Sequence, residues 1–130
     1  MFYQNVRSIR RKFTHIEASL NTFVDVPHII MLTETWLHEK ISNPELSLSK
    51  YRVYRNDRFC EDSDNPTVGG GVLIAIDKTF SSSQIVLSSN DEDNLKLEEL
   101  FVKVTIGRNK FIFIVVYIPP DSDVELYEFH

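Results

Sequence analysis

Residues 28–36 read His28-Ile29-Ile30-Met31-Leu32-Thr33-Glu34-Thr35-Trp36, an apolar run that ends directly in polar residues. The segment 28–32 is apolar and partly β-branched without polar alternation, which is typical of a strand buried on both faces. Such strands belong mostly to sheets that helices cover. We therefore expect a buried strand here, with Glu34 following its carboxyl end.

A helix is predicted before this strand. Ser8 suits a helix N-cap, and apolar residues then recur at spacings of three and four, which predicts one buried stripe: Ile9, Phe13, Ile16, Leu20 and Phe23. Pro27 ends the segment. Residues 1–5 are typical of the end of a short strand. The order strand, helix, strand then indicates that this strand and the one at 28–32 form a parallel pair with a right-handed crossover.

Five further strands are predicted, at residues 51–55, 72–76, 82–88, 100–106 and 111–118. The last two are joined by a turn at 107–110 and form a hairpin. The run 111–118 is too dense in apolar residues for an edge strand. Because a hairpin adds antiparallel neighbours, we expect one mixed sheet in a single α/β (or α+β) domain that covers residues 1–130.

The composition indicates a folded globular domain. Of 130 residues, 42% are apolar and 25% are charged, which argues against disorder. No stretch approaches the 18 apolar residues of a membrane span, so we expect no membrane partner. A single cysteine, Cys60, excludes an internal disulfide and a CxxC zinc site and fits a reducing compartment. An intracellular location is expected, and a nuclear one is compatible with the sequence.

Charge is unevenly distributed along the chain. The net charge is −5, yet residues 1–60 contain 9 Lys/Arg and 6 Asp/Glu, whereas residues 61–130 contain 5 and 13. A nucleic-acid surface would therefore lie on the first half, where basic side chains could neutralise phosphates. The alternative, equally compatible with these counts, is that both halves present solvated faces.

Polar side chains follow three of the predicted strands. Asn5, Glu34 and Tyr117 each stand at a carboxyl end, where ligands gather in open α/β sheets. If the first two strands are neighbours, the Asn5 amide and the Glu34 carboxylate would meet in one pocket and offer Mg²⁺ hard oxygen ligands. On pattern alone, Glu34 could equally be a cap or surface carboxylate, Asn5 a turn residue and Tyr117 a core tyrosine with its hydroxyl at the rim.

Six blocks of the sequence, in this order, resemble the endonuclease/exonuclease/phosphatase superfamily. They are YQNVRS at 3–8, PHIIMLTETWL at 27–37, YRVYRNDR at 51–58, GGGVLIAI at 69–76, LEELFV at 97–102 and VYIPP at 116–120. Within that superfamily they are most similar to the apurinic-type endonuclease domain of non-LTR (LINE-like) retrotransposons, which accompanies a reverse transcriptase.

The resemblance implies a fold and a site. The fold is a four-layer α/β sandwich of two packed mixed sheets, of which this chain would be the N-terminal half. The activity is hydrolysis of DNA phosphodiesters by metal-assisted water. Glu34 would be a ligand of one Mg²⁺ (or Mn²⁺) ion, Asn5 would line the same site, and Tyr117 would approach the scissile phosphate. Contacts to DNA phosphates would come from Arg7, Arg10 and Arg11, for which a solvated helix face is the alternative.

The chain departs from the family pattern in one respect. The pattern continues with an Asp-x-Asn block and a Ser-Asp-His block, and neither is present in these 130 residues. We therefore expect this partial domain to bind metal weakly and to be inactive as an isolated chain. Two alternatives remain: a non-catalytic interaction module that pairs with a missing C-terminal half or another chain, and a phosphatase of the same superfamily.

Overall fold

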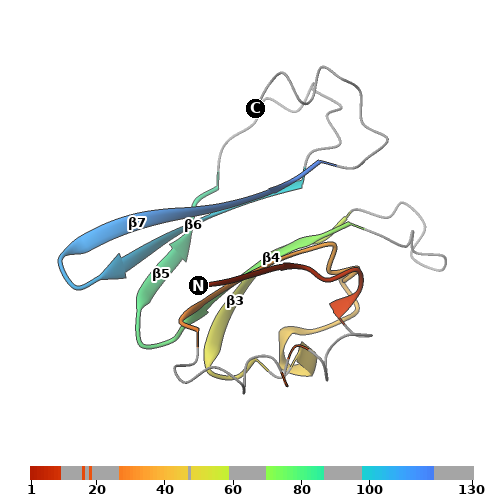
Figure 1. Ribbon diagram of the computed structural model, residues 1–130, viewed down its shortest axis with the longest axis horizontal. Coiled ribbons are helices and arrows are strands. Elements are labelled where there is room, and N and C mark those ends of the chain that lie inside the picture. The colour runs from red at the N-terminus through yellow and green to blue at the C-terminus, as the bar shows by residue number, and fades with distance from the viewer. Residues whose placement is uncertain are drawn as a thin grey trace.

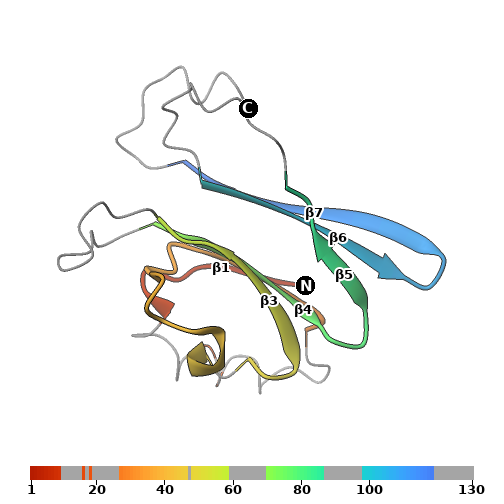
Figure 2. The ribbon, with the colours of Figure 1, turned by 180° about the vertical axis from the view of Figure 1, so that it is seen from behind.

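The computed structural model of the chain describes residues 1–9, 16, 18, 27–46, 48–58, 70–86 and 98–118. Two β-sheets are stacked on each other, as Figures 1 and 2 show. The described elements are β1 (Phe2–Asn5), β2 (Ile29–Thr33), the 3₁₀-helix η1 (Asn43–Leu46), β3 (Tyr51–Asn56), β4 (Val72–Asp77), β5 (Ser81–Gln84), β6 (Glu98–Ile106) and β7 (Asn109–Tyr117). Within these residues, no helix has the length and apolar character needed to cross a membrane.

The first sheet has four strands in the order β1-β2-β4-β3. β1 and β2 are parallel, with Asn5 opposite Thr33, whereas β4 is antiparallel to both β2 and β3. The predicted parallel pair and the predicted buried strand at 28–32 are thus confirmed. This sheet is mixed because of β4 and β3, which follow the parallel pair in the chain.

The second sheet has three antiparallel strands in the order β5-β6-β7. The expectation that the hairpin joins the same sheet as β2 is therefore wrong, and the resemblance, which implied two sheets, was the better guide. A hairpin determines only its own pairing, and the sheet that it joins depends on contacts with strands far away in the sequence. The predicted strand at 82–88 corresponds to β5, which covers residues 81–84.

The described part of the chain also differs from the prediction that residues 111–118 cannot form an edge. β7 lies at the edge of the described three-stranded sheet, and Phe111, Ile112 and Ile114 are 44%, 60% and 49% exposed. An apolar run shows that a strand has apolar side chains on both faces, but it does not show that both faces are covered. Of the β7 side chains, Val115 is buried among residues that face the first sheet.

The core consists of two clusters, one on each face of the first sheet. Side chains of β4 alternate between them: Leu73 and Ala75 face the first cluster, and Val72, Ile74 and Ile76 face the second. The first cluster includes Val6, Ile9, Ile16, Leu37, Ile41 and Leu46. Ile9 and Ile16 are helical and buried, as predicted, although most of the predicted helix lies outside the described residues. The second cluster joins the two sheets.

These layers agree with the predicted α/β class and with part of an endonuclease/exonuclease/phosphatase-like sandwich. Helical residues and η1 cover one face of the mixed sheet, and the antiparallel sheet packs on its other face. The carboxyl ends of β2, in the first sheet, and of β7, in the second, lie at the same end of the molecule, where the two strands contact each other.

At the opposite end of β4, Asp77 organises the turn into β5. Its Oδ1 atom accepts the backbone N–H of Thr79 at 2.9 Å, and its Oδ2 atom lies 2.9 Å from Nδ1 of His28, which precedes β2. The hydrogen bond from Thr79 and then the interaction with His28 hold the pKa of Asp77 below its ordinary value of 3.8. The ionised carboxylate therefore links β2 to the turn.

Asp77→Asn is expected to lower the melting temperature at neutral pH, because it removes the carboxylate that accepts the Thr79 N–H and lies 2.9 Å from Nδ1 of His28. Because the pKa of Asp77 is lower in the folded chain than in the unfolded one, its contribution is present above pH 3.8 and is lost as the pH falls through the folded value. The gap between variant and wild type should therefore shrink below pH 3.8, as thermal melts at a series of pH values would measure. Glu39→Gln, at an exposed position, is the control, and a gap that does not change with pH would contradict the assignment.

Candidate functional site

Asn5 is the last residue of β1 and Glu34 directly follows β2, so both lie at the same end of two neighbouring parallel strands. Asn5 is opposite Thr33, the last residue of β2, in the parallel register, and Glu34 directly follows Thr33. The loops beyond remain paired, since Val6 N–H donates to the Thr33 carbonyl at 3.0 Å and Ser8 N–H to the Glu34 carbonyl at 2.9 Å. The predicted juxtaposition of these two strand ends is confirmed. Asn5 is exposed and Glu34 is half-buried.

The backbone of these two loops is strained. Four residues other than glycine have left-handed φ angles, namely Arg7 (45°), Ser8 (87°), Glu34 (54°) and Trp36 (58°). Such residues cost roughly 1–3 kcal/mol each and persist where the surrounding structure holds them. Here the backbone bonds between the two loops, and those from Thr35 and Trp36 to the carbonyls of Gly71 and Gly70, hold them. Strain of this kind concentrates at functional sites.

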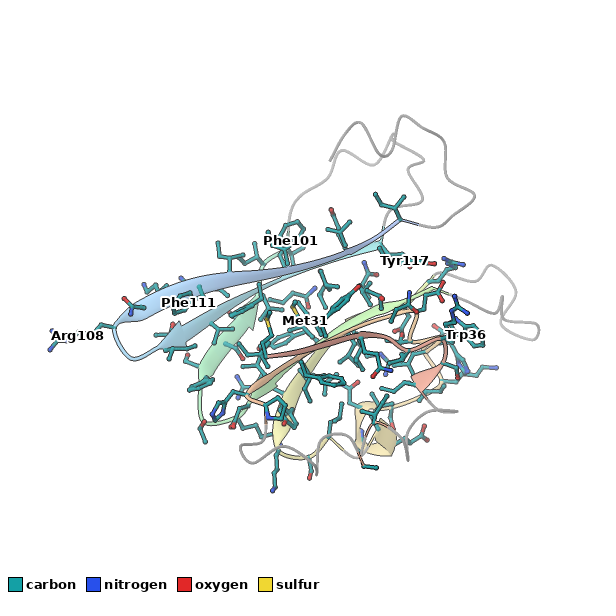
Figure 3. The ribbon with its side chains drawn as sticks, in the orientation of Figure 1. Met31, Trp36, Phe101, Arg108, Phe111 and Tyr117 are labelled. Carbon is teal, nitrogen blue, oxygen red and sulfur yellow. The ribbon has the colours of Figure 1, made fainter. Side chains whose placement is uncertain are left out.

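Tyr117 reaches the same place from the second sheet. Its hydroxyl donates a hydrogen bond to Oε1 of Glu34, although the two residues are 83 positions apart in the chain. Figure 3 shows Tyr117 at the end of the molecule where Trp36 also lies, far from Arg108 at the hairpin tip. All three strand-end residues named from the sequence therefore gather at one end.

Burial, followed by the hydrogen bond to Glu34 and its negative charge, raises the pKa of Tyr117 to about 12. The tyrosine consequently keeps its proton at neutral pH and remains a hydrogen-bond donor. A donor that is fixed between the two sheets can hold the Glu34 carboxylate in one orientation.

An ion pair between Arg58 and Glu98 lies beside Tyr117, and the sequence analysis assigned no role to it. Glu98 is the first residue of β6 and stands directly opposite Tyr117 in the β6–β7 register. Its Oε1 atom accepts Nε–H of Arg58 at 2.7 Å, and its Oε2 atom accepts the backbone N–H of Gly71 at 3.0 Å. One signal could have found it: Glu98 is in phase with Leu100, Val102 and Val104, so a carboxylate occupies the apolar face of the strand.

The glycines before β4 allow this pair to form. Gly70 and Gly71 have φ angles of 72° and 92°. A Cβ at Gly70 would overlap the side chains of Arg58 and Glu98, and one at Gly71 would overlap the Thr35 hydroxyl. Gly70 and Gly71 thus lead directly into β4, and Gly69 lies outside the described residues.

The predicted DNA-contacting arginines are described only in part. Arg7 is exposed and lies two residues beyond Asn5, on the same edge of the sheet. Arg10 and Arg11 lie outside the described residues. Their contact with phosphates remains a prediction.

The donor atoms at this edge suit one weakly held Mg²⁺ or Mn²⁺ ion. Among the described residues, no group of three or more His, Cys, Asp or Glu side chains gathers to hold a metal. Glu34 and Asn5 offer one carboxylate and one amide oxygen, and Mg²⁺ is commonly bound through one or two carboxylates together with waters and substrate phosphates. The residues therefore fit an open Mg²⁺ site and do not fit a closed one.

Comparison with known proteins supports the fold. No family model matches the chain, and no curated protein matches it. Among solved structures, the crystal structure of truncated Caenorhabditis elegans TDP2 matches with a TM-score of 0.54 and 17% sequence identity, over 95% of this chain and 46% of the TDP2 chain. The chain thus spans less than half the length of that structure. At this identity the likeness shows that the two chains share a fold, and nothing further.

Proposed function

We propose that this chain contributes the glutamate-containing part of the active site of a Mg²⁺-dependent phosphodiesterase that acts on DNA. The observation that supports this most directly is the hydrogen bond from Tyr117 to Glu34, which joins the two sheets beside Asn5. A half-buried tyrosine and a carboxylate thus meet beside the carboxyl ends of the parallel strands β1 and β2, where α/β sheets bind ligands, and Asn5 is the last residue of β1.

Each of the three side chains has a chemical role in this proposal. Glu34 and Asn5 would hold the metal ion through their side-chain oxygens. When bound, the ion supplies stabilisation of negative charge on the phosphate and on the leaving oxygen. Tyr117 donates its single hydroxyl proton to Glu34 and so orients the Glu34 carboxylate at the place where the phosphate would lie.

We further propose that the enzyme is an endonuclease of the retrotransposon type. The support is the similarity of the blocks at residues 3–8 and 27–37, which lie on the two strands that frame the site. The Asp-x-Asn and Ser-Asp-His blocks of that family are not among these 130 residues. The general base and its partner groups would therefore have to come from elsewhere, and the chain alone should not nick DNA.

Mn²⁺ binding tests the metal assignment. Titration of Mn²⁺ into the ¹⁵N-labelled chain is expected to broaden the amide signals of Asn5 and Glu34 and to spare Arg108 at the hairpin tip. Removing the only carboxylate of the pair in Glu34→Gln should weaken binding by at least about tenfold. Glu45→Gln, at an exposed position in η1, should leave binding unchanged.

Equal Mn²⁺ affinity in Glu34→Gln and wild type would contradict the metal assignment. A plasmid assay examines the activity itself. Supercoiled DNA with Mg²⁺ should remain intact in the presence of the chain, whereas robust nicking that disappears in Glu34→Ala would show that these residues suffice for catalysis.

The exposed apolar side chains of β7 favour one alternative, a non-catalytic interaction module. Phe111, Ile112 and Ile114 are all exposed on a strand at the edge of the described sheet. Apolar surface of this kind commonly marks a contact with other protein. Sedimentation and a thermal melt distinguish the interaction module from the phosphodiesterase. A chain that is monomeric and melts cooperatively would argue against an obligatory partner chain.

A further inference from the structure

Two buried threonine hydroxyls stand on either side of Glu34 in the chain. Thr33 and Thr35 are 1% and 0% exposed. Within the described part of the chain, neither hydroxyl oxygen has a hydrogen-bond partner. A buried hydroxyl without a partner costs free energy, because it has lost its hydrogen bonds to water and gained none in return. Native proteins keep few such groups, so each one calls for an explanation.

The side chain of Thr33 points between the two sheets. Leu32 belongs to the first core cluster, whereas Met31 packs against the second and lies between the sheets in Figure 3. Because side chains alternate along a strand, Thr33 is in phase with Met31. Its hydroxyl is therefore on the face of β2 that the second sheet covers, from which Tyr117 reaches Glu34.

Asn5 presents its side chain on the same face, from the neighbouring strand. Phe2 packs against the first cluster, so Asn5, three residues later, is directed to the opposite face of β1. Asn5 is paired with Thr33 in the parallel register, and neighbouring strands lie about 4.8 Å apart. The Asn5 amide and the Thr33 hydroxyl are therefore adjacent groups on one face of the sheet.

The chemistry of a carboxamide gives this hydroxyl a use. An amide that offers its oxygen to a cation keeps two N–H donors, and an acceptor for one of them fixes the orientation of the whole group. A threonine hydroxyl oxygen carries two lone pairs that can accept such a bond. The Thr33 oxygen can thus accept one N–H of Asn5 and hold the amide oxygen in one orientation.

We propose that Thr33 is a positioning residue of the candidate metal site, and that its hydroxyl accepts an N–H of Asn5 when the Asn5 oxygen binds the cation. The proposal rests on the proposed function and adds to it a residue that acts through Asn5. The lone hydroxyl is then a loss of stability that the metal-free chain carries because the site requires it, as is common where stability and function compete.

Thr33→Val removes the hydroxyl and keeps the shape of the side chain. Without metal, the melting temperature of this variant should equal or exceed that of the wild type, because no hydrogen bond within the chain is lost. Mn²⁺ affinity, followed by broadening of the Glu34 amide signal in the ¹⁵N-labelled chain, should fall about tenfold, as for other residues that orient a metal ligand. Thr33→Ser keeps the hydroxyl and should bind Mn²⁺ nearly as tightly as the wild type.

Thr35→Val is the matched control. It makes the same chemical change at a hydroxyl that is just as buried and that also lacks a partner among the described residues. The Thr35 oxygen lies beside Gly71, which leads into β4, and so on the side of β2 away from Asn5. The melting temperature of Thr35→Val should also equal or exceed that of the wild type, but its Mn²⁺ affinity should stay unchanged. Equal losses of affinity in the two valine variants would overturn the role of Thr33.

The side-chain amide signals of Asn5 report the proposed hydrogen bond. At saturating Mg²⁺, one of the two Asn5 N–H signals of the wild type should shift more than the other, because only one is hydrogen-bonded, and this difference should vanish in Thr33→Val. Unchanged Mn²⁺ affinity in Thr33→Val, or a lower melting temperature of that variant without metal, would overturn the role of Thr33 and leave the metal assignment in place. Absence of Mn²⁺ binding at Glu34 in the wild type would instead reject the metal assignment, and the role of Thr33 with it.

Discussion

Ile74→Ala is expected to destabilise the chain by about 2–5 kcal/mol, the range for truncating a fully buried aliphatic side chain. Ile74 lies at the centre of β4 and packs in the cluster that joins the two sheets. Because the sheets are stacked through this cluster, the contact between Tyr117 and Glu34 depends on it. We therefore expect weaker binding of Mn²⁺ as well as a lower unfolding free energy, measured by urea denaturation.

The matched control is Ile112→Ala on β7. Ile112 is also a strand isoleucine, but it is 60% exposed. Its loss should change the unfolding free energy by no more than about 0.5 kcal/mol. A large loss for Ile112→Ala would instead show that the outer face of β7 is covered in solution, for example by a second chain, and would favour the interaction-module hypothesis.

Gly71→Ala is expected to cost about 3 kcal/mol. A residue with a Cβ pays roughly 1–2 kcal/mol in the left-handed region that Gly71 adopts at φ 92°. The added Cβ would also meet the buried Thr35 hydroxyl at 2.5 Å, and such overpacking typically adds about 1–3 kcal/mol. The displaced backbone would weaken the hydrogen bond from Gly71 to Glu98.

Gly107→Ala separates the two causes. Gly107 has a φ of 63°, and nothing lies within 4 Å of the position where its Cβ would be. This substitution should therefore show the backbone cost alone, about 1–2 kcal/mol. Equal losses of stability in the two variants, measured by urea unfolding, would contradict the close packing of Gly71 against Thr35.

Local patterns predicted the strands of this protein well. The alternation of Leu100, Val102 and Val104 with Phe101 and Lys103 matches the inward and outward faces of β6, because side chains alternate along any strand. The unbroken apolar segments at 28–32 and 72–76 are the two central strands of the first sheet. Such patterns depend only on neighbours in the chain, so they can be found without knowledge of the fold.

The candidate site was predicted only in its parts. Each strand end could be named because polar residues follow apolar runs, which placed Asn5, Glu34 and Tyr117 on the candidate list. Arg58 received no role, because it lies in a polar segment and its partner Glu98 is 40 residues away. Local periodicity shows that the Glu98 carboxylate occupies the apolar face of β6, but it does not show which distant residue pairs with it.

The sequence by itself determined which segments are strands, which faces are apolar, and that Glu34 stands where a buried parallel strand ends. Only the tertiary structure decided that the hairpin forms a second sheet, that β7 lies at the edge of the strands described there, that Tyr117 contacts Glu34, and that Arg58 pairs with Glu98 opposite Tyr117. The physical reason is the range of the interactions. Side-chain periodicity arises between adjacent residues, whereas sheet stacking arises from apolar contacts between segments that the chain brings together only on folding.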